Sequence, residues 1–241
     1  MMAIPPYSLG FPGTDAQSAY YPGPEILSRN EIVAVSRLTE QQKILPENTR
    51  ISKSRSPTGE IRYTILQAST SEISRSDEPF GPENMRVVLK PGDHKNELLK
   101  LCEELRQALE YAANDSQRRT IELYIASFES GDLEVYRDAL RTWVRDVGPK
   151  VEHIIGFVEP YRDPYGIRSE FEGIVAIADP NETKRLQELV KHSDRFIRRL
   201  PWCVGSIEND GKGPFEKSLF EPPDFSSIHG NFELSNCCRS Y

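Results

Sequence analysis

Apolar residues recur at helical spacing through the middle of the chain. The first stripe is made of Leu98, Leu101, Cys102, Leu105, Ala108, Leu109 and Ala112. Residues three and four apart lie on one face of a helix, so this stripe predicts an amphipathic helix over 95–113. A second stripe begins after Asp115 or Ser116, either of which can cap a helix, and ends at Gly131, while a third begins at Asp132. Stripes of this kind are typical of core-facing helices rather than of ligand sites.

Other segments alternate apolar and polar residues with a period of two, which is typical of strands. Residues 48–52 and 61–68 lie on either side of a Ser-Pro-Thr-Gly turn and predict a hairpin. An apolar run that begins at Ile154 and a second run over 168–178 flank the sequence Asp-Pro-Tyr-Gly at 163–166. Proline presets the backbone angle that a turn needs and glycine tolerates a positive φ, so a second, antiparallel hairpin is expected here.

The remaining segments give weaker patterns. Asn30 is expected to cap a short helix that ends near Gln42. A short strand is expected over 85–89, within a loop that extends over 69–96 and is rich in Ser, Asp, Pro and Gly. Residues 180–200 begin with a proline and are followed by another, and they predict a long helix.

Composition narrows the class of protein. The 241 residues carry a net charge of -7 and their basic residues are interleaved with acidic ones, so nucleic acid is not expected as a partner. No run approaches the roughly 20 apolar residues of a membrane span and the start lacks a signal peptide, so we expect no membrane association and a cytoplasmic protein. The four cysteines contain no Cys-x-x-Cys pair, and they do not indicate a disulfide scaffold.

Charged and phenolic side chains gather at the ends of the second predicted hairpin. They are Glu159, Tyr161, Arg162, Asp163, Glu170 and Glu172. Because side chains alternate along a strand, Glu159 and Tyr161 are expected to point to one side, and Glu170 and Glu172 to share a face. Such a group could bind an ammonium group, a metal or a basic peptide. The alternative is a solvated hairpin end with ordinary ion pairs to Arg162 and Arg168.

The same residues carry a resemblance to a known family. The runs Gly-Phe-Val-Glu-x-Tyr-Arg-Asp-Pro-Tyr-Gly at 156–166 and Glu-Phe-Glu-Gly at 170–173 closely resemble dipeptidyl peptidase III, the family of zinc exopeptidases that remove dipeptides from peptide N-termini. Further matching motifs follow in order at 111–114, 124–131, 143–152, 200–202, 215–217 and 223–225. Ordered motifs over about residues 10–226 are far more specific than one short pattern.

The resemblance implies an α+β fold. It implies part of the lower lobe of a two-lobed metallopeptidase, with β-barrel-type strands plus helices, and a helical segment of the upper lobe. On this basis, residues 1–25 are an irregular lead-in, 26–179 the lower-lobe portion, 180–225 the upper-lobe segment and 226–241 a divergent tail. Strands that would close the barrel are missing, so open edges and an unstable fold are expected.

The resemblance also implies a Zn²⁺ cofactor for the full-length enzyme, held by a His-Glu-Leu-Leu-Gly-His helix and a later glutamate. Neither motif occurs in this chain, and its histidines are His94, His153, His192 and His229, with no His-x-x-x-His pair. We therefore expect no zinc ligands here. The family pattern ends after Ser227. The chain therefore resembles a truncated or alternatively spliced product.

Roles can be carried over by resemblance to matching residues. Tyr161 would stabilise the oxyanion of the substrate, Glu159 would hold the free N-terminal ammonium of a peptide, and Glu172 would be a further substrate contact. Pro160 replaces a residue that is often Ser in the family, and it marks an edge position or a local bend. Peptides with a free N-terminus are the expected partners, and without zinc no peptidase activity is expected from the chain alone. The alternative is a non-catalytic module that binds a peptide or protein.

Overall fold

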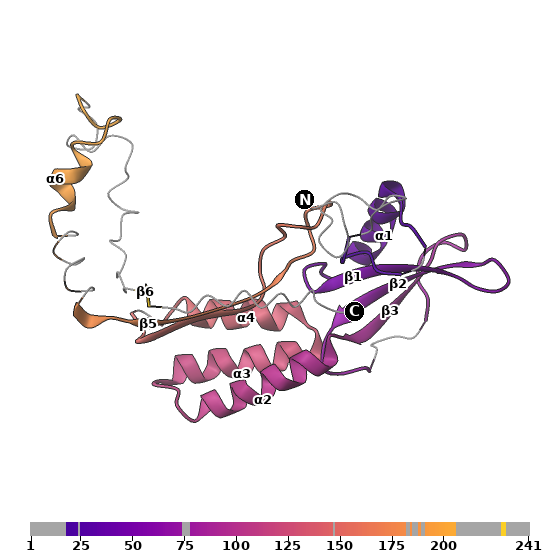
Figure 1. The fold of residues 1–241 in the computed structure, drawn as a ribbon, viewed down its shortest axis with the longest axis horizontal. Helices are drawn as coiled ribbons and strands as arrows, with labels where there is room; N and C mark the ends of the chain where they lie inside the picture. The colour runs from indigo at the N-terminus through magenta and orange to yellow at the C-terminus, as the bar shows by residue number, and fades with distance from the viewer. Residues whose placement is uncertain are drawn as a thin grey trace. The chain divides into compact units, whose positions relative to one another are not determined.

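Helices and strands are mixed along the described part of the chain, which confirms the α+β class (Figure 1). The computed structural model describes residues 18–23, 25–73, 78–146, 148–181, 184, 188, 191–205 and 228–229. The chain divides into two compact units. The first comprises Met1–Asp146, Ile155–Gly173 and Leu234–Tyr241, and the second comprises Val147–Ile154 and Ile174–Glu233.

The first unit begins with helix α1 (Arg29–Gln41). Ser28 caps this helix, because its hydroxyl accepts the Glu31 amide hydrogen and the Glu31 carboxylate accepts the Ser28 amide at 2.8 Å. This reciprocal pair satisfies two amide groups that a helix start leaves without partners. The prediction that Asn30 caps the helix is therefore wrong by two positions, since Asn30 already lies inside the first turn.

A three-stranded sheet follows, with strand order β1-β2-β3. Strands β1 (Thr49–Arg55) and β2 (Ile61–Ala68) are antiparallel, which confirms the first predicted hairpin. Strand β3 (Arg86–Asp93) runs parallel to β2 and is longer than predicted, so the predicted loop over 69–96 is partly strand. One face of these elements forms a core of Tyr20, Tyr21, Leu27, Ile32, Val35, Ile51, Tyr63, Ile65 and Val87.

Three successive helices form the second core of the first unit. They are α2 (Lys95–Leu109), α3 (Asp115–Ser130) and α4 (Leu133–Trp143), close to the predicted segments, and Figure 1 shows them side by side. Asn114 caps α3, one residue before the predicted cap, and Gly131 ends it at φ +73°. In the first stripe Leu98, Cys102 and Leu105 are buried, with Cys102 fully buried as its place in the stripe predicts, whereas Ala108 is exposed.

The second predicted hairpin is formed by β4 (Val151–Phe157) and β5 (Phe171–Ala178), with the short β6 (Ile228–His229) antiparallel to β5. Strand β5 begins three residues later than predicted. Gly156 of β4 lies against the Tyr136 ring, so a Cβ at this position would meet the ring carbon Cε2 at 2.5 Å. Only glycine allows the strand to come this close to the helix.

The second unit also contains α6 (Ser193–Ile197), which falls within the helix predicted over 180–200. The remainder of that prediction lies in part outside the described residues. So do the predictions for the lead-in up to residue 17 and for the tail, except for Ile228–His229, which form β6. Among the helices that the structure describes, none is long and apolar enough to cross a membrane.

Candidate functional site

The residues of the predicted site lie at the two ends of the loop that joins β4 to β5. Asp163 organises this loop, because its carboxylate accepts the amide hydrogens of Tyr165 at 3.1 Å, Ile167 at 3.0 Å and Arg168 at 2.9 Å. The amide of Gly166 donates to the carbonyl oxygen of Asp163 at 2.8 Å, and Gly166 has a φ of +77°. The predicted turn at 163–166 is thereby confirmed, with the aspartate bonding to the backbone as expected.

The same aspartate anchors the loop in the interior. The Tyr21 hydroxyl donates to Asp163 Oδ1 at 2.5 Å, and Arg168 Nη1 lies 3.9 Å from Asp163 Oδ2. The Arg168 guanidinium lies 5.5 Å from the centre of the Tyr21 ring, and its Nη2 donates to Ser36 Oγ at 3.4 Å. Burial is the largest cause that raises the pKa of Tyr21, so its hydroxyl keeps the proton that it donates.

We call Tyr21, Ser36, Asp163 and Arg168 the loop anchor. The interpretation of Arg168 as part of an ordinary surface ion pair is wrong, because its side chain is only 1% exposed and pairs with a fully buried carboxylate. Sequence reasoning missed Tyr21 and Ser36 altogether. No local pattern could have found them, since Tyr21 and Asp163 are 142 residues apart in the chain.

Backbone pairing continues past the end of β4, but not in regular alternation. The Val158 amide donates to the Glu170 carbonyl at 3.1 Å, and the Glu170 amide donates to the Glu159 carbonyl at 3.0 Å. Glu170 therefore faces two residues of the opposite segment, which is the pattern of a bulge. Glu159 and Tyr161 both lie beyond the end of β4, so strand alternation does not orient them, and the expectation that they point to one side stays a prediction. This irregularity fits the local bend that Pro160 suggested.

Electrostatics show that the predicted residues nevertheless act on one another. The charge of Glu159 is the largest cause that raises the pKa of Tyr161, followed by slight burial and by the charges of Glu172 and Glu170. The pKa of Glu172 is also raised, first by burial and then by Glu159 and Glu170. The Tyr161 side chain is 71% exposed and therefore open to a ligand. We call Glu159, Tyr161, Glu170 and Glu172 the acidic patch.

Arg162 and Tyr136 lie beside the acidic patch and limit which of its carboxylates can contact a ligand. Arg162 Nε lies 3.1 Å from Glu170 Oε1, so the predicted ion pair with Arg162 is present and engages Glu170. On the other side, the pKa of the buried Tyr136 is raised to about 12, first by burial and then by the charge of Glu172. Glu159 and Glu172 are therefore the carboxylates left to meet a ligand beside Tyr161. Tyr136 is a further neighbour that sequence reasoning missed.

The described residues do not fit a zinc site. Nowhere in the described ranges do three His, Cys, Asp or Glu side chains come together in a way that could hold a metal ion. The acidic patch is included in this statement, although it holds three carboxylates. We therefore derive no chemical step through a metal for these residues.

Comparison with known proteins identifies the family. Residues 1–232 match Peptidase family M49. Dipeptidyl peptidase 3 of Dictyostelium discoideum is 34% identical over 221 residues, which cover 91% of this chain and 29% of that protein. Dipeptidyl peptidase 3 of Homo sapiens is 33% identical over 197 residues, which cover 78% of this chain and 26% of that protein. The chain thus spans less than a third of the length of these curated relatives.

Among solved structures, DPP III from Caldithrix abyssi matches 76% of this chain and 29% of that chain, at 18% identity and a TM-score of 0.47. The family assignment rests on the sequence match. The motifs at 156–166 and 170–173 lie inside the matched residues, and the resemblance that they predicted is confirmed. Because the match extends over nearly all of its length, the chain belongs to peptidase family M49.

Proposed function

We propose that the acidic patch binds the free N-terminal ammonium group of a peptide, and that it forms the substrate side of a zinc-dependent dipeptidyl peptidase. The observation that carries this proposal is the mutual effect of Glu159, Tyr161 and Glu172, in which each carboxylate raises the pKa of Tyr161. Close negative charges repel one another, and an ammonium group placed between them removes that repulsion. A neutral, acetylated N-terminus cannot do so.

Each residue has a distinct part in the proposal. Glu159 has the largest effect on Tyr161 and accepts hydrogen bonds from the ammonium group. Tyr161 is protonated at neutral pH, as an ordinary tyrosine is, and donates a hydrogen bond to the peptide oxygen on which negative charge develops. Glu172 contributes a second negative charge. Because the sequence has no His-Glu-Leu-Leu-Gly-His segment, we propose that this chain alone does not hydrolyse peptides. A cytoplasmic location is also part of the proposal.

Titration calorimetry with a short peptide and its N-acetylated form tests the site. The proposal predicts saturable binding of the free peptide by the chain, and a weaker affinity for the acetylated form by about tenfold or more, since a hydrogen-bonded charge is lost. Equal affinity for the two forms would show that the acidic patch does not recognise the ammonium group.

A non-catalytic peptide-binding module is the second candidate. It is favoured by the loop anchor, because all four of its residues belong to the first unit and hold the loop without help from another chain. The same calorimetry, combined with a hydrolysis assay in added Zn²⁺, tests the module. Both candidates predict amine-dependent binding without hydrolysis by this chain, whereas hydrolysis in added Zn²⁺ would contradict a non-catalytic module.

A further inference from the structure

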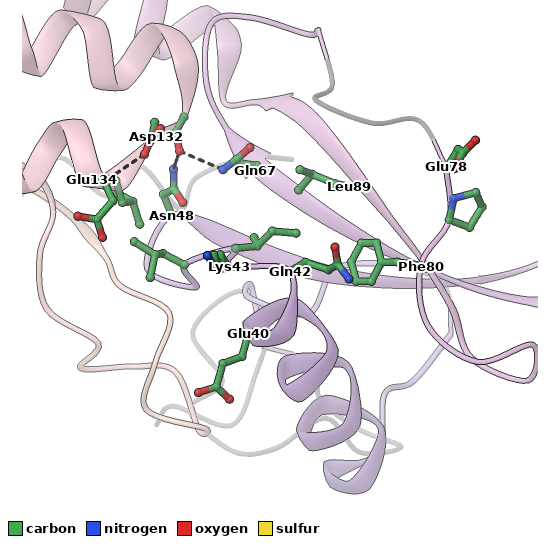
Figure 2. Close-up of a pocket in the computed structure, with 15 residues that line it drawn as sticks. Glu40, Gln42, Lys43, Asn48, Gln67, Glu78, Phe80, Leu89, Asp132 and Glu134 are labelled. Atoms are coloured by element: carbon green, nitrogen blue, oxygen red, sulfur yellow. Dashed lines mark hydrogen bonds between the residues drawn. The ribbon is translucent and has the colours of Figure 1, made fainter.

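The first unit contains a cavity that the proposed function does not use. It has a volume of about 760 Å³ and lies between the end of α1, the sheet and the turn that joins α3 to α4 (Figure 2). None of the acidic patch residues lines it. Its apolar wall is formed by Leu45, Phe80, Leu89 and Leu133. A volume of this size is typical of small-molecule sites.

A buried acceptor without a partner faces this cavity. Asn48 is only 5% exposed, and its Nδ2 donates to the carbonyl oxygens of Gly131 at 3.0 Å and Ala68 at 3.4 Å. Because both neighbours are acceptors, the amide cannot be turned round, and its Oδ1 is fixed on the opposite side. That oxygen is buried and accepts no hydrogen bond. Figure 2 shows it directed away from the turn and into the cavity.

A ligand that donates a hydrogen bond to this oxygen would satisfy it. Leaving a buried acceptor unsatisfied is costly, whereas a hydrogen bond from a charged donor is among the stronger kinds. Gln67, which also lines the cavity, donates its Nε2 to the same Gly131 carbonyl at 3.0 Å, so its amide oxygen is likewise turned from that carbonyl.

The charged residues that line the cavity indicate which charge a ligand would carry. Among the described residues that line it, four are acidic, Glu40, Glu78, Asp132 and Glu134, and one is basic, Lys43. Lys43 is exposed, and Glu134 is partly neutralised because its Oε1 lies 2.7 Å from Arg137 Nη1. A cation is therefore favoured over an anion at this cavity.

We propose that the cavity binds a cationic donor on an aliphatic stem, such as the guanidinium or ammonium group of an arginine or lysine side chain. The charged head donates to Asn48 Oδ1, and the stem packs against Leu89 and Leu133. Amphipathic groups of this kind bury the stem while the head keeps polar partners. The proposal does not depend on the function of the acidic patch.

Binding of n-butylguanidinium to the ¹⁵N-labelled chain tests the proposal, followed by the NMR signals of the Asn48 side-chain amide. We expect saturable shifts of these signals. The neutral analogue n-butylurea has the same shape and similar donors, and it should bind more weakly by about threefold or more, because the attraction of the acidic wall is lost. Equal binding of the two compounds, or no shift at Asn48, would overturn the proposal.

Two variants complete the test. Asn48→Leu removes the acceptor and should weaken n-butylguanidinium binding by about tenfold, but it also removes the bonds to Gly131 and Ala68 and can unfold the chain. Lys43→Gln changes an exposed side chain and keeps the fold testable. It should tighten n-butylguanidinium binding by about threefold, since a repelling charge is lost. Weaker binding to Lys43→Gln would instead assign the cavity to an anion.

Discussion

Single residues decide how the loop between β4 and β5 presents its functional groups. The negative charge of Glu159 raises the pKa of both Tyr161 and Glu172. The sequence placed Glu159, Tyr161 and Glu172 among the charged and phenolic residues at the hairpin ends, and the family resemblance selected these three as site residues, which stays a prediction. Strand alternation does not orient Glu159 and Tyr161, because both lie beyond the end of β4, where the backbone opposite Glu170 forms a bulge.

The coupling of Tyr161 to Glu159 can be measured directly. Glu159→Gln removes the negative charge that contributes most to the raised pKa of Tyr161, so the phenolate becomes easier to form and the pKa falls. NMR titration of ¹³C-labelled tyrosine, with the Tyr161 signal assigned by Tyr161→Phe, follows this change. An unchanged or higher pKa would show that the two side chains do not interact.

Gly156 is the residue whose replacement tests the packing beneath the patch. Gly156→Ala places a Cβ 2.5 Å from the Tyr136 ring and should lower the free energy of unfolding by about 1–3 kcal/mol. Urea denaturation gives this value. Gly173→Ala in β5 is a matched control, because no atom lies within 4 Å of its added Cβ, and it should be close to neutral. Equal effects of the two variants would contradict the close approach of Gly156 to Tyr136.

At the level of secondary structure, local patterns were reliable and long-range ones were not. The stripes of α2 to α4 and the alternation of β1 and β2 were readable because each depends on residues a few positions apart. The extension of β3 was missed, since Pro91 and Gly92 within it are typical of loops. The loop anchor was also missed, because it joins residues from both ends of the unit.

The loop anchor predicts a large loss of stability on substitution. Asp163→Asn leaves the Arg168 charge buried without its partner, which should lower the free energy of unfolding by about 3 kcal/mol or more. Hydrogen exchange should also rise at the amides of Tyr165, Ile167 and Arg168, which the carboxylate binds. The exposed Asp138→Asn on α4 is the control. A loss below about 1 kcal/mol would mean that the anchor does not hold the loop.

Helix α1 is joined to the first sheet by a carboxylate that titrates in acid. Glu31 Oε1 lies 2.7 Å from Lys53 Nζ and accepts the Tyr63 hydroxyl at 2.7 Å. Burial alone raises the pKa of Glu31, but hydrogen bonds from Lys53, Tyr63 and Ser28 outweigh it and lower the pKa to about 2. A carboxylate with a depressed pKa stabilises the fold above its unfolded pKa, and this stability is lost as the pH falls.

The free energy of unfolding should therefore decrease from about pH 4.5 down to about pH 2, in part through Glu31. Glu31→Gln should remove this part of the decrease and cost about 1 kcal/mol at neutral pH, since the capping interaction is weakened. Urea denaturation at several pH values measures both effects. An identical pH dependence in the variant would show that Glu31 does not carry the acid loss.

For the whole molecule, the sequence match supplies the family and the structure supplies the setting of the candidate site. The acidic patch and the loop anchor both lie in the first unit. The division into a lower-lobe portion over 26–179 and an upper-lobe segment over 180–225 stays a prediction. Much of the upper-lobe segment lies outside the described residues.

Recognition of a peptide amine by the acidic patch is best tested by calorimetry on Glu159→Gln and on a control, Glu104→Gln, which changes an exposed residue of α2. We predict that the wild-type chain and the control prefer a free peptide over its N-acetylated form by about tenfold or more, and that Glu159→Gln loses most of this preference. A preference retained in Glu159→Gln would contradict the assignment of Glu159 to the ammonium group.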